Sequence, residues 1–148
     1  MAENEAAEAW TVTLVLESTL ESVDIAEERV LSEAAQAGFD EDQQHHIGMS
    51  VRECMVNAVV HGNRYNARKK VTVSISRSAE RLEVIIADEG EGFDMSNLPD
   101  PLADENLLRH SGRGLLLMQA FMDEFQIRPH HPRGTEVRMV KYLGKNNQ

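Results

Sequence analysis

The chain has 148 residues, of which 41% are hydrophobic and 27% charged, as expected for an ordinary globular protein with a single core. Its formal net charge of -10 argues against direct nucleic-acid binding, which requires a basic surface. No apolar run is long enough to span a membrane, and the acidic start is unlike a signal peptide. The single cysteine suits a reducing cytoplasm, so we expect a cytoplasmic protein whose partners are proteins or small ligands.

One strand and two helices are predicted for the N-terminal half. Residues 10–17 are β-branched and apolar, which favours a strand. A helix with apolar residues at helical spacing follows and stops at Gly38. A second helix, capped by Asp40 or Asp42, runs to a stop signal at Gly62.

The second helix has two apolar stripes with a polar pair between them. Glu53 and Asn57 lie one turn apart, where a buried carboxylate and amide without partners would cost about 1–3 kcal/mol for each missing hydrogen bond. A charged ligand with a metal ion would satisfy both side chains, and an ion-free polar pair on a solvated face is the alternative. The first stripe contains Ile47, Val51, Cys54, Met55, Ala58 and Val59, and the second contains Met49, Val56 and Val60. Within the first stripe, we expect Cys54 to be a small core residue and not a nucleophile.

Four strands and one helix are predicted for the C-terminal half. Residues 71–76 alternate apolar and polar, and residues 82–87 end in a run that we expect to be buried on both faces. A long polar segment then extends to Gly112, and a connection of that length is often a functional lid. A helix follows it, and residues 125–128 and 135–142 form a last hairpin. Strands joined by short turns predict an α+β two-layer sandwich, with a mixed, mostly antiparallel sheet and helices on one face.

Asp88 ends a buried strand and is followed by Gly90 and Gly92. Glycines at alternating positions leave room for a flat ligand, and the carboxylate could accept a hydrogen bond from an exocyclic amino group such as that of adenine. An ordinary Asp-Gly turn is the alternative. A calcium loop is excluded because the twelfth position is Pro99, where a bidentate Glu is required.

Ser111-Gly112-Arg113-Gly114 precedes the C-terminal helix. Backbone N–H groups, a helix N-terminus and an adjacent cation form a pattern typical of a phosphate cradle. The P-loop motif and the His-Arg-Asp and Asp-Phe-Gly motifs of eukaryotic-type kinases are absent from the sequence.

Taken together and in order, these motifs resemble the GHKL (histidine kinase-like) ATPase superfamily. The segments Glu53-x-x-x-Asn57-Ala-Val-Val-His61-Gly62-Asn63 and Ser111-Gly112-Arg113-Gly114 are similar to those of the anti-sigma factor serine/threonine kinases. The resemblance implies a histidine kinase-like ATPase domain over residues 11–143, after a flexible tail over residues 1–10.

The resemblance also implies roles for individual residues. Asn57 would ligate Mg²⁺ that bridges the ATP phosphates, and Glu53 would be the base that orients the acceptor hydroxyl. Asp88 would recognise the adenine amino group with support from Thr135. The remaining nucleotide-site residues would be His61, Gly90, Gly92, Ser111, Gly112, Arg113 and Gly114. Arg113 departs from the family pattern, in which a non-basic residue is common at this position.

The function that the resemblance implies is an ATP-dependent protein kinase that acts as an anti-sigma factor. Such a kinase binds a sigma factor and phosphorylates a STAS-domain anti-anti-sigma protein, and we expect it to be a homodimer without direct contact to nucleic acid or membrane. Two alternatives remain open at this stage. One is a switch kinase of the same fold that binds no sigma factor, and the other is a nucleotide-gated binding module without useful phosphotransfer.

Overall fold

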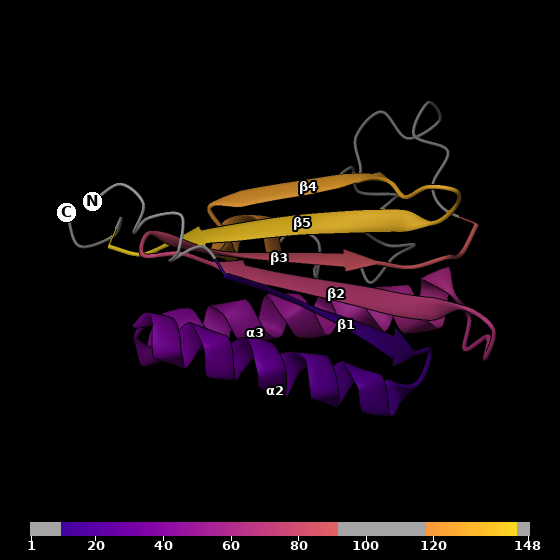
Figure 1. Ribbon diagram of the computed structural model, residues 1–148, viewed down its shortest axis with the longest axis horizontal. Coiled ribbons are helices and arrows are strands. Elements are labelled where there is room, and N and C mark those ends of the chain that lie inside the picture. Colours follow the sequence, from indigo (N-terminus) through magenta and orange to yellow (C-terminus); the bar gives the residue numbers. More distant parts are fainter. Residues whose placement is uncertain (1–9, 92–117, 145–148) are drawn as a thin grey trace.

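The computed structural model describes residues 10–91 and 118–144 (Figure 1). Residues 118–121 are also helical and belong to the predicted C-terminal helix, whose start lies outside the described residues. The elements in chain order are β1 (Trp10–Glu17), α2 (Leu20–Ala37), α3 (Glu41–Val56), the π-helix η1 (Asn57–Gly62), β2 (Lys70–Arg77), β3 (Arg81–Ala87), β4 (Glu124–Pro129) and β5 (Thr135–Tyr142).

The five strands form one sheet in the order β1-β2-β3-β5-β4. Every neighbouring pair of described strands is antiparallel, so the sheet is more regular than the mixed sheet that we expected. Helices α2 and α3 lie side by side against one face, and the other face carries no described helix (Figure 1). The prediction of an α+β two-layer sandwich is confirmed.

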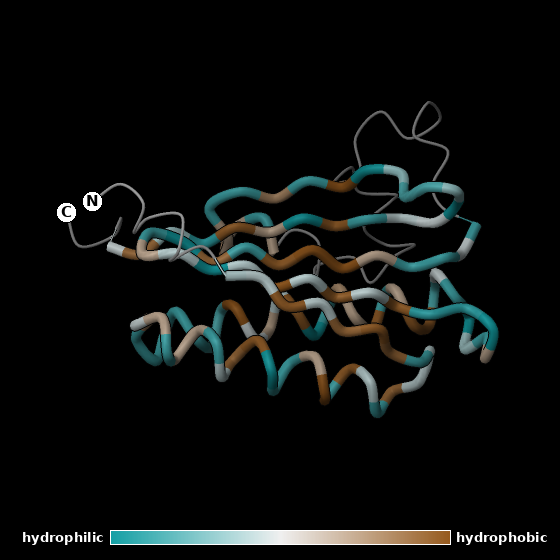
Figure 2. Tube along the Cα trace, viewed as in Figure 1, coloured by the Kyte–Doolittle hydropathy of each residue, from teal (hydrophilic) through white to brown (hydrophobic). Residues whose placement is uncertain are grey.

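The core lies between this sheet and the two helices (Figure 2). Burial alternates along β2 and β3 because successive side chains of a strand point to opposite faces. The fully buried strand residues include Val73, Ile75, Leu82 and Val84. Ile85 is only half-buried on the open face, so the expectation that the end of β3 is buried on both faces is wrong at this residue.

Both helices begin at recognisable capping residues, and α2 also ends at one. Thr19 accepts a hydrogen bond from the Ser22 N–H at the start of α2, and Gly38 ends it with a left-handed φ of 105°. Asp40, one of the two predicted caps, forms a capping box with Gln43 at the start of α3. These caps fix the direction in which α3 runs along the sheet.

The first apolar stripe of the second helix is buried throughout, as predicted. The second stripe is not a buried stripe: Met49 is 40% exposed, whereas Val56 and Val60 are partly buried against the core. The helical layer has the sheet on one side only, so the outer face of α3 near Met49 has no described element to pack against.

Candidate active site

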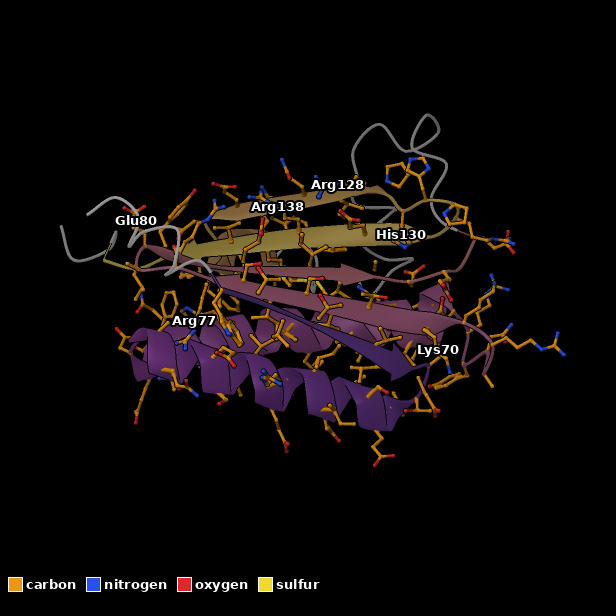
Figure 3. All side chains as sticks on the ribbon, in the orientation of Figure 1. Lys70, Arg77, Glu80, Arg128, His130 and Arg138 are labelled. Atoms are coloured by element: carbon orange, nitrogen blue, oxygen red, sulfur yellow. The ribbon has the colours of Figure 1, made fainter. Side chains whose placement is uncertain are left out.

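Four segments of the chain meet at one end of the sheet. Strand β3 ends there, β2 and β5 begin there, and the last turn of η1 reaches the same end (Figure 1). Lys70 and His130 are labelled at this end in Figure 3, and Arg77 and Glu80 lie at the opposite end. The residues that follow β3 and η1 are therefore brought together although they are about 25 residues apart in sequence.

The helix that carries the Glu53 motif changes from α to π geometry at Asn57. The Asn63 N–H donates to the Ala58 carbonyl at 2.8 Å, five residues earlier, where an α-helix would use the carbonyl four residues earlier. This wider turn contains Asn57 and His61, two of the predicted site residues. Single π-turns of this kind are rare in proteins, and those that occur are often found at functional sites.

The Asp88 carboxylate is 6% exposed and is held by backbone donors from two segments. Its Oδ1 accepts hydrogen bonds from the N–H of Gly90 at 2.9 Å and from the N–H of Thr135 at 3.2 Å. The Asp88 N–H donates in turn to the Thr135 carbonyl at 2.9 Å. Both hydrogen bonds that the described residues donate to this carboxylate end on Oδ1.

Burial raises the pKa of the Asp88 carboxyl above its ordinary value. The two backbone hydrogen bonds from Gly90 and Thr135 oppose this shift, as do His130 and Lys69 at longer range. A carboxylate with a pKa raised by desolvation is a candidate for a ligand-binding role, because a hydrogen-bond donor from a ligand would relieve its burial.

The approach of η1 to Asp88 requires glycine on both sides. A Cβ on Gly62 would lie 2.5 Å from Asp88 Oδ2, and a Cβ on Gly90 would lie 2.1 Å from the Gly62 carbonyl oxygen. Only a residue without a side chain permits such a close approach of backbone to carboxylate. The last turn of the helix and the Asp88 carboxylate thus form one compact unit.

Asn63 holds this unit in place, and the sequence analysis gave it no separate role. Its side chain is 1% exposed, and its Oδ1 accepts from the Glu89 N–H at 2.8 Å. Its Nδ2 donates to Ser18 Oγ at 2.8 Å and to the Lys70 carbonyl at 3.0 Å. Asn63 therefore ties the end of η1 to the end of β1, the start of β2 and the loop after β3.

Glu53 and Asn57 lie in successive turns on the helix that ends at Gly62, and both are partly buried. The Asn57 N–H bonds to the carbonyl of Glu53, so the helix is continuous between them. His61 is exposed in the last turn of η1. Among the described residues, no group of three or more His, Cys, Asp or Glu side chains lies close enough to hold a metal ion.

The structure thus brings Asp88, Gly90 and Thr135 into direct contact and joins them to the helix of Glu53 and Asn57 through Gly62. Five other predicted site residues lie outside the described residues, namely Gly92, Ser111, Gly112, Arg113 and Gly114. Cys54 is buried in the core, and burial raises the pKa of its thiol, which fits the expectation that it is no nucleophile. Within the described ranges, no helix has the length and apolar character needed to cross a bilayer.

The comparisons with known proteins identify the family of the domain. Residues 16–141 match the model of the histidine kinase-like ATPase domain. The chain is 33% identical over 118 residues to the serine-protein kinase RsbW of Bacillus subtilis (strain 168), which covers 74% of this chain and 71% of that protein. It is also 33% identical over 99 residues to the anti-sigma F factor of Bacillus thuringiensis (strain Al Hakam), covering 66% of this chain and 68% of that protein.

The anti-sigma F factor of Bacillus cereus (strain AH187) matches over the same share of its length. A family model that matches most of the chain, together with these relatives, agrees with the order of motifs and the antiparallel sheet. The chain therefore belongs to the histidine kinase-like ATPase family, in its branch of anti-sigma factor serine kinases, and the predicted class of enzyme, a protein serine/threonine kinase, is confirmed.

Proposed function

We propose that the chain is an ATP-dependent anti-sigma factor that phosphorylates a serine or threonine of a STAS-domain antagonist protein. The observation that carries the proposal is the contact of Asp88 with Gly62 and Thr135 at the end of the helix that bears Glu53 and Asn57. Phosphoryl transfer requires mainly positioning and charge neutralisation. The proximity of the buried Asp88 carboxylate to the helix of Glu53 and Asn57 supports a site of this kind.

In this proposal, Asp88 Oδ2 accepts a hydrogen bond from the adenine amino group while Gly90 and Thr135 hold Oδ1. Asn57 would provide an oxygen ligand for Mg²⁺, a hard cation that prefers oxygen ligands. The bound Mg-ATP supplies the phosphoryl group and the positive charge that offsets its oxygens. His61, exposed in the last turn of η1, borders the same nucleotide.

Glu53 is the proposed base. It accepts the proton of the acceptor hydroxyl while the hydroxyl oxygen forms its bond to the γ-phosphorus and ADP leaves with the electrons of the broken bond. Gly92 would complete the purine pocket, and Ser111, Gly112, Arg113 and Gly114 would border the triphosphate. These five assignments rest on the sequence motifs alone.

The partners in this proposal are proteins. The relatives' names include a serine-protein kinase and an anti-sigma F factor, which supports a partner switch between a sigma factor and an antagonist. A net charge of -10 favours contact with the basic surface of a DNA-binding protein and disfavours contact with DNA itself. We also propose that the protein is cytoplasmic and acts as a homodimer.

The test combines two measurements on the purified full chain. The first is co-purification with each sigma factor of the source cell at low and at moderate salt, and the second is transfer of labelled γ-phosphate to each of its STAS-domain proteins. We expect one salt-sensitive sigma complex and one phosphorylated STAS-domain protein. Transfer without any sigma complex would leave a switch kinase of the same fold, and a sigma complex without transfer would leave a nucleotide-gated binding module.

A further inference from the structure

Residues 64–69, hereafter the basic loop, join η1 to β2 and carry a charge opposite to that of the whole chain. The chain contains 25 acidic and 15 basic side chains, whereas the basic loop contains Arg64, Arg68 and Lys69 and no acidic residue. In the part of the chain that the structure describes, no carboxylate lies within ion-pair distance of these three cations. The arginines that do have carboxylate partners are Arg29, Arg52, Arg77, Arg128, Arg133 and Arg138.

The backbone of the basic loop is held by hydrogen bonds of ordinary length. The Tyr65 N–H donates to the Val59 carbonyl at 3.0 Å, and the Lys69 N–H donates to the Asn66 carbonyl at 3.0 Å. Asn66 Oδ1 accepts from the Arg68 N–H at 2.8 Å. A loop that is ordered before binding loses little conformational freedom when a partner docks.

Two consecutive residues of the loop have left-handed backbones that side chains rarely adopt. Arg64 has φ of 53° and Tyr65 has φ of 60°, and neither is glycine. Each such backbone is strained relative to a right-handed one. That strain does not bury either side chain, since Arg64 is exposed and Tyr65 is 52% exposed. The strained backbone instead presents an arginine and a tyrosine to solvent, and both residue types are enriched among interface hot spots.

The loop lies beside the candidate active site. The Lys69 carbonyl accepts from Ser18 Oγ at 2.6 Å, and the next carbonyl, that of Lys70, accepts from Asn63 Nδ2 at 3.0 Å. Asn63 also binds the backbone that follows Asp88, so the loop and the Asp88 unit share one clamp. In Figure 3, Lys70 marks the root of the loop at the end of the sheet where His130 also lies.

We propose that the basic loop is a docking site for an acidic surface of the protein that receives the phosphoryl group, with Tyr65 as its apolar anchor. Cations that have no carboxylate partner among the described residues attract an acidic substrate protein and repel a basic, DNA-binding partner. The loop would therefore favour the antagonist over a sigma factor at this end of the molecule. Only the naming of the partner as phosphoryl acceptor rests on the proposed function; the acidic docking surface itself does not.

The experiment uses the full chain and a fluorescein-labelled twelve-residue peptide of Asp and Glu with a central Leu. Arg64→Gln/Arg68→Gln removes two positive charges from the loop. The left-handed backbone at Arg64 strains a glutamine as much as an arginine, so the variant changes charge and not backbone strain. Arg52→Gln/Arg128→Gln is the matched control, because it changes the net charge equally at two ion-paired arginines on other elements. By fluorescence anisotropy at low salt, we expect the loop variant to bind the peptide about tenfold more weakly and the control to bind it like wild type.

Two further arms separate this proposal from others. Tyr65→Ala should also weaken peptide binding, and ATP affinity by calorimetry should stay within about twofold in all variants, because the loop is not placed in contact with nucleotide. Equal weakening in the loop variant and the control would mean that net charge alone is sensed, and it would overturn the proposal. Loop-dependent binding of a 20-base-pair DNA duplex, with no loop-dependent binding of the peptide, would overturn it as well.

The kinase arm keeps the two proposals distinguishable. For a phosphorylated STAS-domain protein, the loop variant should raise KM at least about fivefold with kcat unchanged, since docking is lost and chemistry is not. An unchanged KM would overturn the assignment of the partner as substrate. If no protein is phosphorylated by wild type, the proposed kinase substrate fails while the peptide result still decides whether the loop docks an acidic surface.

Discussion

The backbone of Gly62 touches the carboxylate of Asp88, so that a Cβ on Gly62 would lie 2.5 Å from Oδ2 and 2.6 Å from Cγ. This contact joins the end of the helix that carries Glu53 and Asn57 to the end of strand β3. It occurs on the carboxylate oxygen that the described backbone donors leave open. The geometry of the candidate nucleotide site thus depends on the absence of a side chain at Gly62.

Gly62→Ala should leave the protein folded and reduce its nucleotide affinity. The added methyl group would displace the Asp88 carboxylate, and a loss of about 1.4 kcal/mol or more in binding corresponds to about a tenfold higher Kd. Calorimetric titration with Mg-ATP measures this change. Gly144→Asn is a suitable control because nothing lies within 4 Å of a Cβ there and asparagine tolerates the left-handed φ of 77°. An unchanged Kd in Gly62→Ala would show that Asp88 Oδ2 does not contact the nucleotide.

Asn63→Leu should destabilise the fold by about 2–4 kcal/mol. The substitution removes the three hydrogen bonds of a side chain that is 1% exposed, including the one to the buried Ser18 Oγ, and a buried group left unsatisfied costs about 1–3 kcal/mol. Urea unfolding gives the free energy of unfolding. Asn66→Ala, an exposed asparagine in the same connection, should cost less than about 1 kcal/mol. Equal losses in the two variants would mean that Asn63 is no clamp.

Glu33→Gln should destabilise the opposite end of the molecule. Glu33 is 5% exposed and lies 3.1 Å from the Arg29 Nε and 3.2 Å from the Arg77 Nε, and both arginines lie within 6 Å of the Trp10 ring centroid. Loss of the negative charge would leave the two arginines without their shared carboxylate partner, which costs about 2–4 kcal/mol in a partly buried network. Trp10 is the only tryptophan, so its fluorescence reports this region directly. Wild-type stability by both fluorescence and circular dichroism would contradict the prediction.

The regular elements were predictable because their signals are local. The capping box of Asp40 and Gln43 spans four residues, and the left-handed Gly38 follows the last residue of α2. The alternation in β2 needs only a stretch of neighbouring residues to be read. Since these signals specify where elements start and stop, the element order and fold class followed from them.

The parts that were not predictable depend on contacts between distant segments. Nothing in Asn-Ala-Val-Val-His-Gly specifies a π-helix, and the approach of Gly62 to Asp88 at its end joins two segments that are far apart in the sequence. The clamp of Asn63 joins it to Ser18 and Glu89, which are 45 and 26 residues away. An asparagine directly after a helix-ending glycine was the available signal, but asparagine is common at such positions without any buried role. The exposure of Met49 in the second apolar stripe has a related reason, because only packing decides whether a helix has one covered face or two.

Asp88→Asn should make the protein without nucleotide more stable while it weakens ATP binding. Burial raises the pKa of Asp88 in the folded protein, so the folded state holds its proton more tightly than the unfolded state does. Stability is then lost as the pH rises from the ordinary aspartate pKa of about 3.9 to the raised value, and the loss persists at neutral pH. Asparagine removes this penalty, and its side-chain oxygen can still accept from the N–H groups of Gly90 and Thr135.

Two measurements check this pair of effects. The Tm of Asp88→Asn without nucleotide should exceed that of wild type at neutral pH, and the difference should vanish as the pH falls below the ordinary aspartate value. Its Kd for ATP should rise about tenfold to a hundredfold, as expected for the loss of a charge-assisted hydrogen bond worth about 1.5–3 kcal/mol. A variant that is less stable than wild type at every pH would show that the carboxylate is a structural acceptor and not a strained binding group.

Glu53 and Asn57 should separate chemistry from metal binding. They lie in successive turns of one continuous helix that ends against Asp88, so a single bound nucleotide can meet both. Glu53→Gln keeps the size and shape of the side chain, but its amide cannot take up a proton. Phosphoryl transfer should therefore slow by about 10²–10⁴-fold, while the affinity for Mg-ATP stays near that of wild type. Asn57→Ala should instead lose the part of the ATP affinity that depends on Mg²⁺.

Glu41→Gln, in the exposed first turn of α3, is the matched control and should retain full activity. Single-turnover transfer to a STAS-domain protein and calorimetry with and without Mg²⁺ give the two quantities for each variant. Full transfer activity in Glu53→Gln would remove Glu53 as the base.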